Sequence, residues 1–437
     1  MSFPKYPKYK DSGVEWLGEV PEHWEVKPLK AATTHNDEVL DETTNPDMEI
    51  FYVDISSVDS VNGIGNKERM FFSAAPSRAR RLVRHGDVII STVRTYLRAI
   101  AKIKDPEENL VVSTGFVVIR PTSKVMSDFL GYLVFACFFV EQVIARSTGV
   151  SYPAINASDL VAIPVTVPPP VEQTAIASFL DRETAKIDEL VAEQRRLIEL
   201  LTEKRQAVIS HAVTKGLNPH APMKPSGIEW LGDVPEHWLV GKCGFHLAIL
   251  SGFAFPSSEF SHDDDNVKLL RGINVGVGRL KWDETVFWRR NNKDGLDDYE
   301  LQAGNIVIGM DRPLIADGVR VAKVKESDLP CLLLQRVASI KPHSTLNPDF
   351  FLALISSEMF VAHFYPETTG VSVPHISPEQ ISSFIIPVPP VTEQAEIAEY
   401  IGVVTTRYVD LVTEAQRAID LLQEPVSYTH LTLPTKA

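Results

Sequence analysis

With 437 residues, 44% of them hydrophobic, the chain is too long for one ordinary core and has enough apolar material for two or three. Its net charge of −14 argues against a surface that coats nucleic acid indiscriminately, although it permits a local basic face. Its three cysteines, Cys137, Cys243 and Cys331, are far apart and include no CxxC pair, so neither a disulfide framework nor a zinc site is indicated.

An aromatic segment near the N-terminus occurs a second time in the chain. SGVEWLGEVPEHW at residues 12–24 and SGIEWLGDVPEHW at residues 226–238 differ at only two of thirteen positions. Such a duplication indicates two copies of one structural unit. The tryptophans concerned are Trp16, Trp24, Trp230 and Trp238. They could stack on bases, but a tryptophan pair present in both copies is more typical of a packed scaffold. The histidine of each copy has no second ligand at metal spacing, which favours a structural role.

The sequence shows no sign of a membrane span or a secretory signal. The residues before Ser12 contain Lys and Tyr but lack the apolar stretch of a signal peptide. The longest apolar run, at residues 129–140, is far shorter than the roughly 20 residues that span a bilayer. We therefore expect a core helix in this run and a cytoplasmic protein.

Each half of the chain contains a concentration of basic residues. In the first half it is SRARRLVRHGD at residues 77–87, and in the second it lies within residues 281–293. These side chains have the character of phosphate contacts, and an exposed helix face is an equally good interpretation of the first group. The candidates are Arg78, Arg80 and Arg81 in the first half and Lys281, Arg289 and Arg290 in the second.

A glycine turn, a short apolar β run and an arginine recur in both halves. GDVIISTVR at residues 86–94 aligns with GNIVIGMDR at residues 304–312. The candidate DNA contacts here are Arg94, Tyr96 and Arg98 in the first half and Arg312 and Arg320 in the second. An arginine fork can bind guanine O6 and N7 bidentately, and an aromatic neighbour can pack on sugar or base. A solvated strand end or an intramolecular ion pair explains each residue equally well when it is taken alone.

A third repeated stretch begins with a TGVS turn. TGVSYPAINASDLVAIPVTVPPPVEQ at residues 148–173 aligns with TGVSVPHISPEQISSFIIPVPPVTEQ at residues 369–394. The offset between the halves has drifted only from 214 to 221, which indicates one scaffold with two sets of variable loops. The turns offer hydroxyl and N–H groups to phosphates or base edges, although a plain turn is equally consistent. The residues concerned are Thr148, Ser151, Thr369 and Ser372.

A long helical pattern closes each half. In residues 173–215 apolar side chains recur at spacings of three and four, and Gly216 ends the pattern. The second pattern covers residues 392–424 and stops at Pro425. The predicted seam residues are Ile176, Leu180, Ile187, Leu190, Leu197 and Leu201 in the first helix and Ile397, Ile401, Tyr408, Leu411 and Leu422 in the second. At about 1.5 Å per residue the first helix is longer than a small domain needs, so we expect a coiled-coil spacer.

The sequence therefore predicts a domain–helix–domain–helix chain of the α+β class. Two similar mixed α/β domains are separated by a long antiparallel two-helix coiled coil with pseudo-twofold symmetry. The predicted bounds are 12–168 and 226–389 for the domains, 169–216 and 390–424 for the helices, and 425–437 for a tail that does not fit the repeat. The second helix is truncated relative to the first, and the origin of the tail, native or artefactual, stays open. One chain with this symmetry imitates a dimeric DNA reader, and its two half-sites need not be palindromic.

In these combined motifs the chain resembles the specificity subunit of Type I restriction–modification systems. The resemblance covers residues 12–424 and includes the doubled EWLG-VPEHW segment, the doubled TGVS stretch and the sequence EKRQAVIS…VTKGL. It implies two target-recognition domains that each read one half of a bipartite double-stranded DNA target, while the coil sets the gap. It also implies a non-catalytic chain that recruits two modification subunits and restriction subunits. S-adenosylmethionine, ATP and Mg are then expected on those partners, and no cofactor in this chain.

The sequence gives little support for a catalytic function. GIG at residues 63–65 and GVG at residues 276–278 lack the third glycine of a dinucleotide site, and neither a GxxxxGK[ST] loop nor a GxSxG elbow occurs. The acidic run at residues 263–265 lacks the ligand pattern of a calcium loop. The runner-up interpretation is a protein-only scaffold, whose coiled coil docks partner helices and whose two domains bind proteins. The negative net charge favours that alternative slightly.

Overall fold

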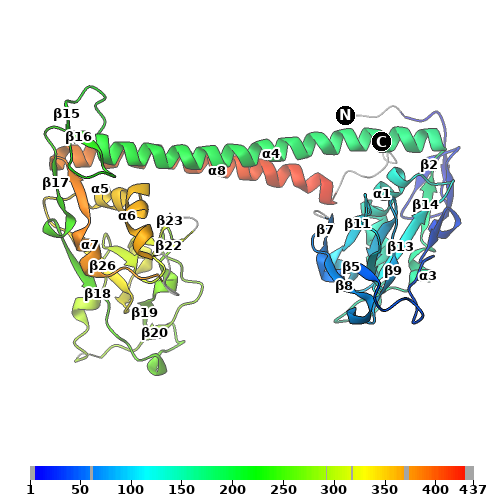
Figure 1. The fold of residues 1–437 in the computed structure, drawn as a ribbon, viewed down its shortest axis with the longest axis horizontal. Helices are drawn as coiled ribbons and strands as arrows, with labels where there is room; N and C mark the ends of the chain where they lie inside the picture. Colours follow the sequence, from blue (N-terminus) through cyan, green and yellow to red (C-terminus); the bar gives the residue numbers. More distant parts are fainter. Residues whose placement is uncertain (1–4, 60–62, 292, 316–317, 369–373, 429–437) are drawn as a thin grey trace. The chain divides into compact units, whose positions relative to one another are not determined.

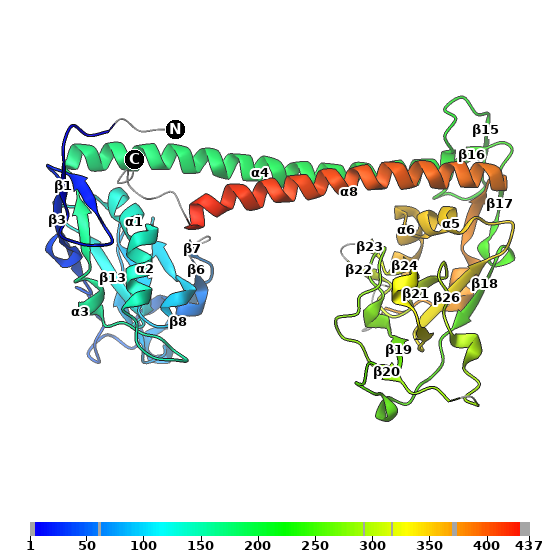
Figure 2. The same ribbon diagram turned by 180° about the vertical axis from the view of Figure 1, so that it is seen from behind.

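The computed structural model of the chain describes residues 5–59, 63–291, 293–315, 318–368 and 374–428. The chain divides into two compact units, one of Met1–Arg195 with Gln416–Ala437 and one of Arg196–Ala415. Each unit contains a globular part and segments of two long helices, α4 and α8, which are green and red in Figures 1 and 2.

The globular part of the first unit is built from short strands and three helices. Its strands are β1 Tyr9–Asp11, β2 Glu19–Pro21, β3 Glu25–Pro28, β4 Thr33–His35, β5 Glu49–Val53, β6 Val58–Asp59, β7 Gly63–Ile64, β8 Glu68–Phe71, β9 Ala79–Leu82, β10 Val88–Ser91, β11 Ile100–Lys102, β12 Leu110–Ser113, β13 Phe116–Pro121 and β14 Pro164–Val167. Its helices are α1 Ser127–Phe135, α2 Cys137–Ala145 and α3 Ala157–Leu160.

The second unit has a matching set of elements. Its strands are β15 Met223–Pro225, β16 Asp233–Pro235, β17 Leu239–Lys242, β18 Leu247–Ser251, β19 Val267–Leu270, β20 Phe287–Trp288, β21 Ile306–Gly309, β22 Leu314–Ile315, β23 Gly318–Val319, β24 Val321–Lys323, β25 Cys331–Leu333, β26 Val337–Pro342 and β27 Ile385–Val388. Its helices are α5 Pro348–Ile355, α6 Glu358–Thr368 and α7 Pro378–Ser383.

The two units share most of their sheet topology, although one sheet has four strands in the first unit, β8-β5-β12-β9, and three in the second, β20-β19-β25. The order β11-β10-β13-β4 in the first unit corresponds to β24-β21-β26-β18 in the second. A second sheet contains a parallel pair in both units, β5 with β12 and β19 with β25. The two-stranded antiparallel pairs β1-β2 and β3-β14 also have counterparts, β15-β16 and β17-β27. The predicted duplication of a mixed α/β domain is therefore confirmed.

The central strand of each unit separates two cores. All four residues of β10 are buried, which is typical of a strand covered on both faces. Because side chains alternate along a strand, Val88 and Ile90 join the core under the helices, while Ile89 joins a second core on the other face. In β21 the same alternation places Ile306 on one side and Val307 on the other.

The apolar run at residues 129–140 forms two helices instead of the single helix expected. The chain bends by 57° between α1 and α2, and Ala136 at the bend has an extended backbone. The bend allows Phe129 of α1 and Phe139 of α2 to enter the same core. The prediction that the run is core material is confirmed. Among the described residues no single helix is long and apolar enough to cross a membrane. Only the bent pair of α1 and α2, with both helices counted as one segment, has the required length and composition.

The repeated aromatic segment fastens each globular part to the start of a long helix. In the first unit Trp24 is buried, and its indole Nε1 donates a 2.9 Å hydrogen bond to Glu172 in the first turn of α4. His23 lies 2.6 Å from the same carboxylate. In the second unit His237 lies 2.8 Å from Glu393 in the first turn of α8. Trp24 and Trp238 are buried, and Trp16 and Trp230 pack half-buried against the two cores, which agrees with the predicted scaffold role of the tryptophans.

A buried glutamine at the start of each long helix explains the repeated proline-rich stretch. The Gln173 side chain accepts a hydrogen bond from the Met126 N–H and donates to the Lys124 and Pro168 carbonyls. Its counterpart Gln394 accepts from the Asn347 N–H and donates to the Thr345 and Pro389 carbonyls. The amide satisfies backbone groups that burial would otherwise leave unpaired.

The long helix α4, Pro170–Lys215, ends at Gly216, whose φ of 76° is typical of a helix C-terminus. Its buried and half-buried stripe alternates by three and four residues and consists of Ala177, Leu180, Thr184, Ile187, Val191, Gln194, Ile198, Leu201, Arg205, Val208 and Ala212. Leu190 and Leu197 were predicted on the seam but are exposed. They are adjacent to the true seam positions Val191 and Ile198, so the predicted register was wrong by one residue there. Ile176 is half-buried against the first core.

The second long helix, α8 Val391–Tyr428, has a similar stripe. It consists of Ala398, Ile401, Thr405, Tyr408, Val412, Ala415, Ile419 and Leu422. Leu411 is exposed, so its assignment to the seam is wrong, while Ile397 is buried in the second core. The helix also continues through Pro425, where we expected it to stop. A proline inside a helix removes one backbone hydrogen bond and crowds the preceding turn, which can kink a helix without ending it.

Within the second unit α4 and α8 run antiparallel. Ile209 and Ala212 of α4 share one core with Ile397 and Ile401 of α8. Gly216, directly after α4, lies against the first turn of α8, because a Cβ atom on it would be 3.3 Å from Glu393 Oε1. The end of one helix therefore lies beside the start of the other, as both views show (Figures 1 and 2). The pseudo-twofold relation between the two units stays a prediction.

Candidate nucleic-acid interface

In the first unit the predicted arginine after β10 stands on a surface formed by two loops. Arg94 precedes a short 3₁₀ helix, η4 Thr95–Leu97, and has a left-handed backbone with φ of 52°. Its N–H donates to the Pro153 carbonyl at 2.8 Å, and its guanidinium lies 4.5 Å from the centre of the Tyr152 ring. The loop containing the TGVS turn is therefore fastened beside η4.

This two-loop surface carries exposed aromatic and apolar side chains around Arg94. They are Tyr96, Leu97, Val150 and Tyr152, and the predicted Thr148 and Ser151 are exposed on the same loop. Sequence reasoning identified Tyr96 and the TGVS turn, but it considered only the hydroxyl and N–H groups of that turn and so missed Leu97, Val150 and Tyr152. Such side chains are suited to pack on sugars, bases or thymine methyl groups.

Arg98, the third candidate beside η4, is held within the first unit. Its Nη2 lies 2.6 Å from Glu141, and its side chain is mostly buried. The intramolecular ion pair that was the alternative interpretation is therefore present for Arg98. No such pair involves Arg94 among the described residues.

The basic cluster of the first unit lies on a strand, because β9 occupies Ala79–Leu82. The exposed helix face that we considered for this cluster is therefore wrong. Arg78 forms a 2.6 Å ion pair with Asp54, and Arg80 packs 4.9 Å from the Phe72 ring. Arg81 is half-buried, its Nη1 has no partner among the described residues, and burial lowers its pKa. Their role as phosphate contacts stays a prediction.

The second unit fastens its predicted arginine in the same manner. The Arg312 N–H donates to the Pro374 carbonyl at 2.7 Å, and Asp311 forms a β-bridge with His375. Arg312 also has a left-handed backbone, with φ of 46°, and its side chain is exposed. The other two predicted residues of this region, Thr369 and Ser372, lie outside the described residues.

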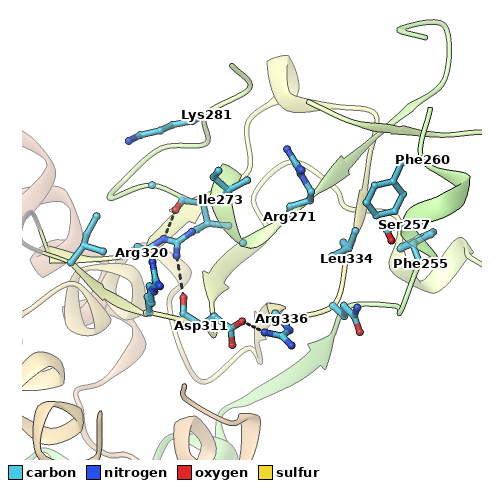
Figure 3. A pocket seen from close by; sticks show the side chains of 16 residues that line it. Phe255, Ser257, Phe260, Arg271, Ile273, Lys281, Asp311, Arg320, Leu334 and Arg336 are labelled. Atoms are coloured by element: carbon cyan, nitrogen blue, oxygen red, sulfur yellow. Dashed lines mark hydrogen bonds and ion pairs between the residues drawn. The ribbon is translucent and has the colours of Figure 1, made fainter. Parts of the chain in front are cut away.

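A groove of about 790 Å³ opens beside Arg312 (Figure 3). Its cationic side chains are Arg271, Lys281, Arg312, Arg320 and Arg336, and Asp311 is the one carboxylate among its described lining residues. Its apolar wall includes Phe255, Phe260, Ile273 and Leu334. This excess of positive charge over an apolar wall suits a polyanion whose bases can pack on the wall. We refer to this cavity as the second-unit groove.

Arg320 is held rigidly at the side of the second-unit groove. Its Nε donates to the Val275 carbonyl at 2.9 Å and its Nη1 to the Asp311 carbonyl at 3.1 Å. Burial lowers the pKa of Arg320, while the negative charge of Asp311 opposes that shift. A guanidinium remains charged after a moderate shift because its ordinary pKa lies so high.

Asp311 organises two further groups at this site. Its carboxylate oxygens lie 2.6 Å from Arg336 Nη1 and 2.8 Å from His375 Nδ1. Burial alone would raise the pKa of Asp311, but the hydrogen bonds with Arg336 and His375 lower it below the ordinary value. Figure 3 shows Asp311 between Arg320 and Arg336. Sequence reasoning missed this network because its members are far apart in the chain.

The remaining basic candidates of the second unit differ in how free their side chains are to contact DNA. Lys281 is exposed and lines the second-unit groove. Arg290 lies within 3.3 Å of Asp294, Asp297 and Glu300, so its guanidinium is already engaged by carboxylates. Arg289 is exposed and does not line the groove. Lys281 is therefore better placed for DNA than either arginine.

A family model of the Type I restriction modification DNA specificity domain matches residues 77–200 and 261–420. These two regions together make up more than half of the chain, and one falls mainly in each repeat.

Individual proteins that are similar to this chain point to the same family. The chain is 28% identical over 291 residues to the Type I restriction enzyme MjaVIII specificity subunit of Methanocaldococcus jannaschii, and the match covers 66% of each chain, so the chain spans about two thirds of this relative. A chain in a solved structure on assembly and conformational transition of the type I R-M system is 22% identical, with a TM-score of 0.68 over 94% of this chain and 98% of that one. The HsdS subunit of Thermoanaerobacter tengcongensis is 23% identical, with a TM-score of 0.53 over 93% and 97% of the two chains.

Proposed function

Because the chain belongs to the Type I restriction modification DNA specificity domain family, we propose that it selects the DNA target of a Type I restriction–modification complex. Each globular domain, at residues 12–168 and 226–389, reads one half of a bipartite, asymmetric double-stranded target. The helices at 169–216 and 390–424 set the separation of the two halves.

One observation carries this proposal. The same arginine, Arg94 in one unit and Arg312 in the other, is fastened at the same place by a hydrogen bond to a proline carbonyl. The surfaces around it have diverged, with exposed aromatic and apolar side chains in the first unit and the cationic groove in the second. A shared frame with different contact surfaces is what a reader of two unlike half-sites requires.

The exposed face of the long helices supports recruitment of partner subunits. Leu190, Leu197 and Leu200 of α4 and Tyr400 and Val403 of α8 are exposed apolar side chains outside the buried stripes. Apolar side chains at helical spacing are suited to dock partner helices. In this proposal two modification subunits and restriction subunits supply all catalysis in the cytoplasm and bind S-adenosylmethionine, ATP and Mg. This chain supplies recognition and no catalytic residue.

Mapping of methylated bases tests the proposal. The chain is produced with its modification subunits in a host without other methyltransferases, and modified positions in the genomic DNA are sequenced. We expect methylation within a split target with two unlike halves. Replacing residues 25–147 with those of another family member should change one half only. A continuous target, or an exchange that leaves both halves unchanged, contradicts the proposal.

The net charge of −14 favours a second candidate, a protein-only scaffold. Salt titration of the purified complex distinguishes the two functions. Binding to DNA through several phosphates falls steeply as salt increases, whereas an apolar protein interface is nearly insensitive to it. We expect the steep dependence.

A further inference from the structure

Arg320 differs from the other cations of the second-unit groove because two backbone carbonyls already orient it. Lys281 and Arg312 are exposed, and their side chains have no ion pair with a described residue. The guanidinium of Arg320, in contrast, is half-buried and bound to Val275 and Asp311. An immobilised side chain loses little further conformational entropy on binding, so it is suited to a contact that demands exact geometry.

The two tethers leave part of the guanidinium available. They use one N–H of Nε and one of Nη1, so the second Nη1 hydrogen and the Nη2 amino group are uncommitted to any described residue. Nη1 and Nη2 are the two amino groups through which the end of a planar guanidinium donates parallel hydrogen bonds. The edge belongs to the same groove as the exposed Arg312 and Lys281.

The surroundings of Arg320 fit a close and partly desolvated contact. The guanidinium packs beside Gly309, because a Cβ atom on this glycine would be 3.5 Å from Arg320 Cζ. Ile273 adds apolar surface to the same groove and is the labelled apolar residue drawn nearest to Arg320 (Figure 3). Hydrogen bonds are stronger where water is excluded, and a donor left unpaired there is correspondingly costly.

The first unit lacks this arrangement. Ser91 donates its N–H to the Ala99 carbonyl at 2.9 Å, as Gly309 does to the Arg320 carbonyl at 2.9 Å. Ala99 is therefore the structural equivalent of Arg320, and it is buried. An alanine side chain can make no such polar contact, so this feature belongs to one unit only.

We propose that Arg320 reads a guanine in the half-site bound by the second unit, through the guanine N7 and O6 atoms in the major groove. The proposal depends on the function proposed above. Guanine is the base whose major-groove edge offers two acceptors to an arginine fork. The exposed Arg312 and Lys281 then neutralise phosphates, which need charge but little precision. The protein then discriminates between bases more strongly at this guanine than at the other positions that the second-unit groove contacts.

The test combines a base analogue with protein variants. After the methylated target has been mapped, each guanine of the second half-site is replaced in turn by 7-deazaguanine, which lacks N7, or by inosine, which keeps N7 and O6. Binding of the complex with its modification subunits is measured by fluorescence anisotropy at one salt concentration. The proteins are the wild type, Arg320→Ala, Arg320→Lys, and Lys281→Ala as the matched control.

We expect 7-deazaguanine at one position to weaken wild-type binding roughly 5- to 150-fold, whereas inosine has little effect there. Arg320→Ala and Arg320→Lys should bind the natural target more weakly and be insensitive to the replacement, while Lys281→Ala remains sensitive. A second half-site without guanine, no sensitive guanine in the wild type, or equal sensitivity in wild type and Arg320→Ala overturns the proposal. The anisotropy measurements with the wild-type protein do not depend on whether any variant folds. Absence of a split target, in contrast, refutes the proposed function itself.

Discussion

The indole Nε1 of Trp24 donates a hydrogen bond to the carboxylate of Glu172, so an aromatic segment near the N-terminus holds the first turn of a helix that begins at Pro170. His23 and Tyr6 contact the same carboxylate. A negative charge at a helix N-terminus also interacts favourably with the helix dipole. The motif found twice in the sequence is therefore a joint between a globular domain and a spacer helix.

Replacing Glu172 with Gln should destabilise the first unit by about 1 kcal/mol near neutral pH, since charge-assisted hydrogen bonds and the dipole interaction are lost. Burial alone would raise the pKa of Glu172, but hydrogen bonds from Trp24, His23 and Tyr6 lower it. The carboxylate therefore contributes stability above its unfolded-state pKa of about 4.5, and that contribution disappears as pH falls through the lower folded pKa. Chemical denaturation at several pH values measures the difference between Glu172→Gln and wild type.

Glu189→Gln is the control for this change, because Glu189 is exposed on the same helix. It should leave stability almost unchanged at every pH. If Glu172→Gln lost as much stability at pH 3 as at pH 7, the charge would not be the cause.

The sequence predicts the duplicated domain well because its signals are local. Gly86 and Gly304 have nearly equal positive φ values of 89° and 90°, and each precedes a fully buried strand. A turn glycine followed by an apolar run is recognisable without any knowledge of distant partners. The alignment of these stretches was therefore sufficient to identify equivalent residues in the two units.

The register of the long helices was harder to predict, since small and polar residues occupy the buried stripe of α4. Ala177, Thr184 and Gln194 are seam residues. The exposed Leu190 and Leu197 are each one residue away from the seam, and their apolar side chains caused the wrong assignment. Apolar identity alone does not distinguish a leucine that faces solvent from one that faces a partner helix. The register of this helix follows from the regular spacing of three and four residues along its whole length, and not from the type of residue at any single position.

The second-unit groove was only partly predictable for a different reason. Arg312 and Arg320 follow a recognisable strand, but Arg336 and His375 reach Asp311 from other segments. Their association depends on the pairing of strands that are distant in sequence, and no spacing rule encodes it. A left-handed arginine at position 336, with φ of 68°, is likewise evident only from the backbone.

Breaking a buried ion pair should destabilise the first unit. Asp87 is 1% exposed, and Arg120 donates to both of its carboxylate oxygens at 2.9 and 2.8 Å. These bonds raise the pKa of the Arg120 guanidinium. Asp87→Asn should cost about 3 kcal/mol, because it leaves a largely buried arginine without its main counter-charge. Thermal unfolding of the intact chain measures the loss.

The exposed pair of Arg69 and Glu49 provides the comparison for this prediction. Glu49→Gln should change the unfolding transition little, because solvent screens exposed ion pairs. Equal effects of the two substitutions would contradict a special role for burial.

Arg94→Ala should weaken DNA binding by about 1–3 kcal/mol, since Arg94 is exposed beside Tyr152 and has no ion pair with a described residue. If Arg94 contacts a base, discrimination is lost at one position of the first half-site. If it contacts a phosphate, binding to all sequences weakens alike and the salt dependence decreases by about one charge. Anisotropy titrations at several salt concentrations separate the two contacts, and unchanged affinity throughout would remove Arg94 from the interface.

The same substitution at two adjacent residues of α4 should affect different properties of the protein. Val191 is 7% exposed on the buried stripe, whereas Leu190 is 44% exposed outside it. Val191→Asp should destabilise the folded chain by about 2 kcal/mol or more, because a carboxylate would be buried without a partner. Leu190→Asp should leave the unfolding temperature nearly unchanged and instead reduce co-purification of the modification subunits, if that face docks them as proposed. Circular dichroism melting and pull-down from the same preparations give both measurements. A large loss of stability in Leu190→Asp, with none in Val191→Asp, would mean that the leucine seam read from the sequence is correct and the stripe described above is not.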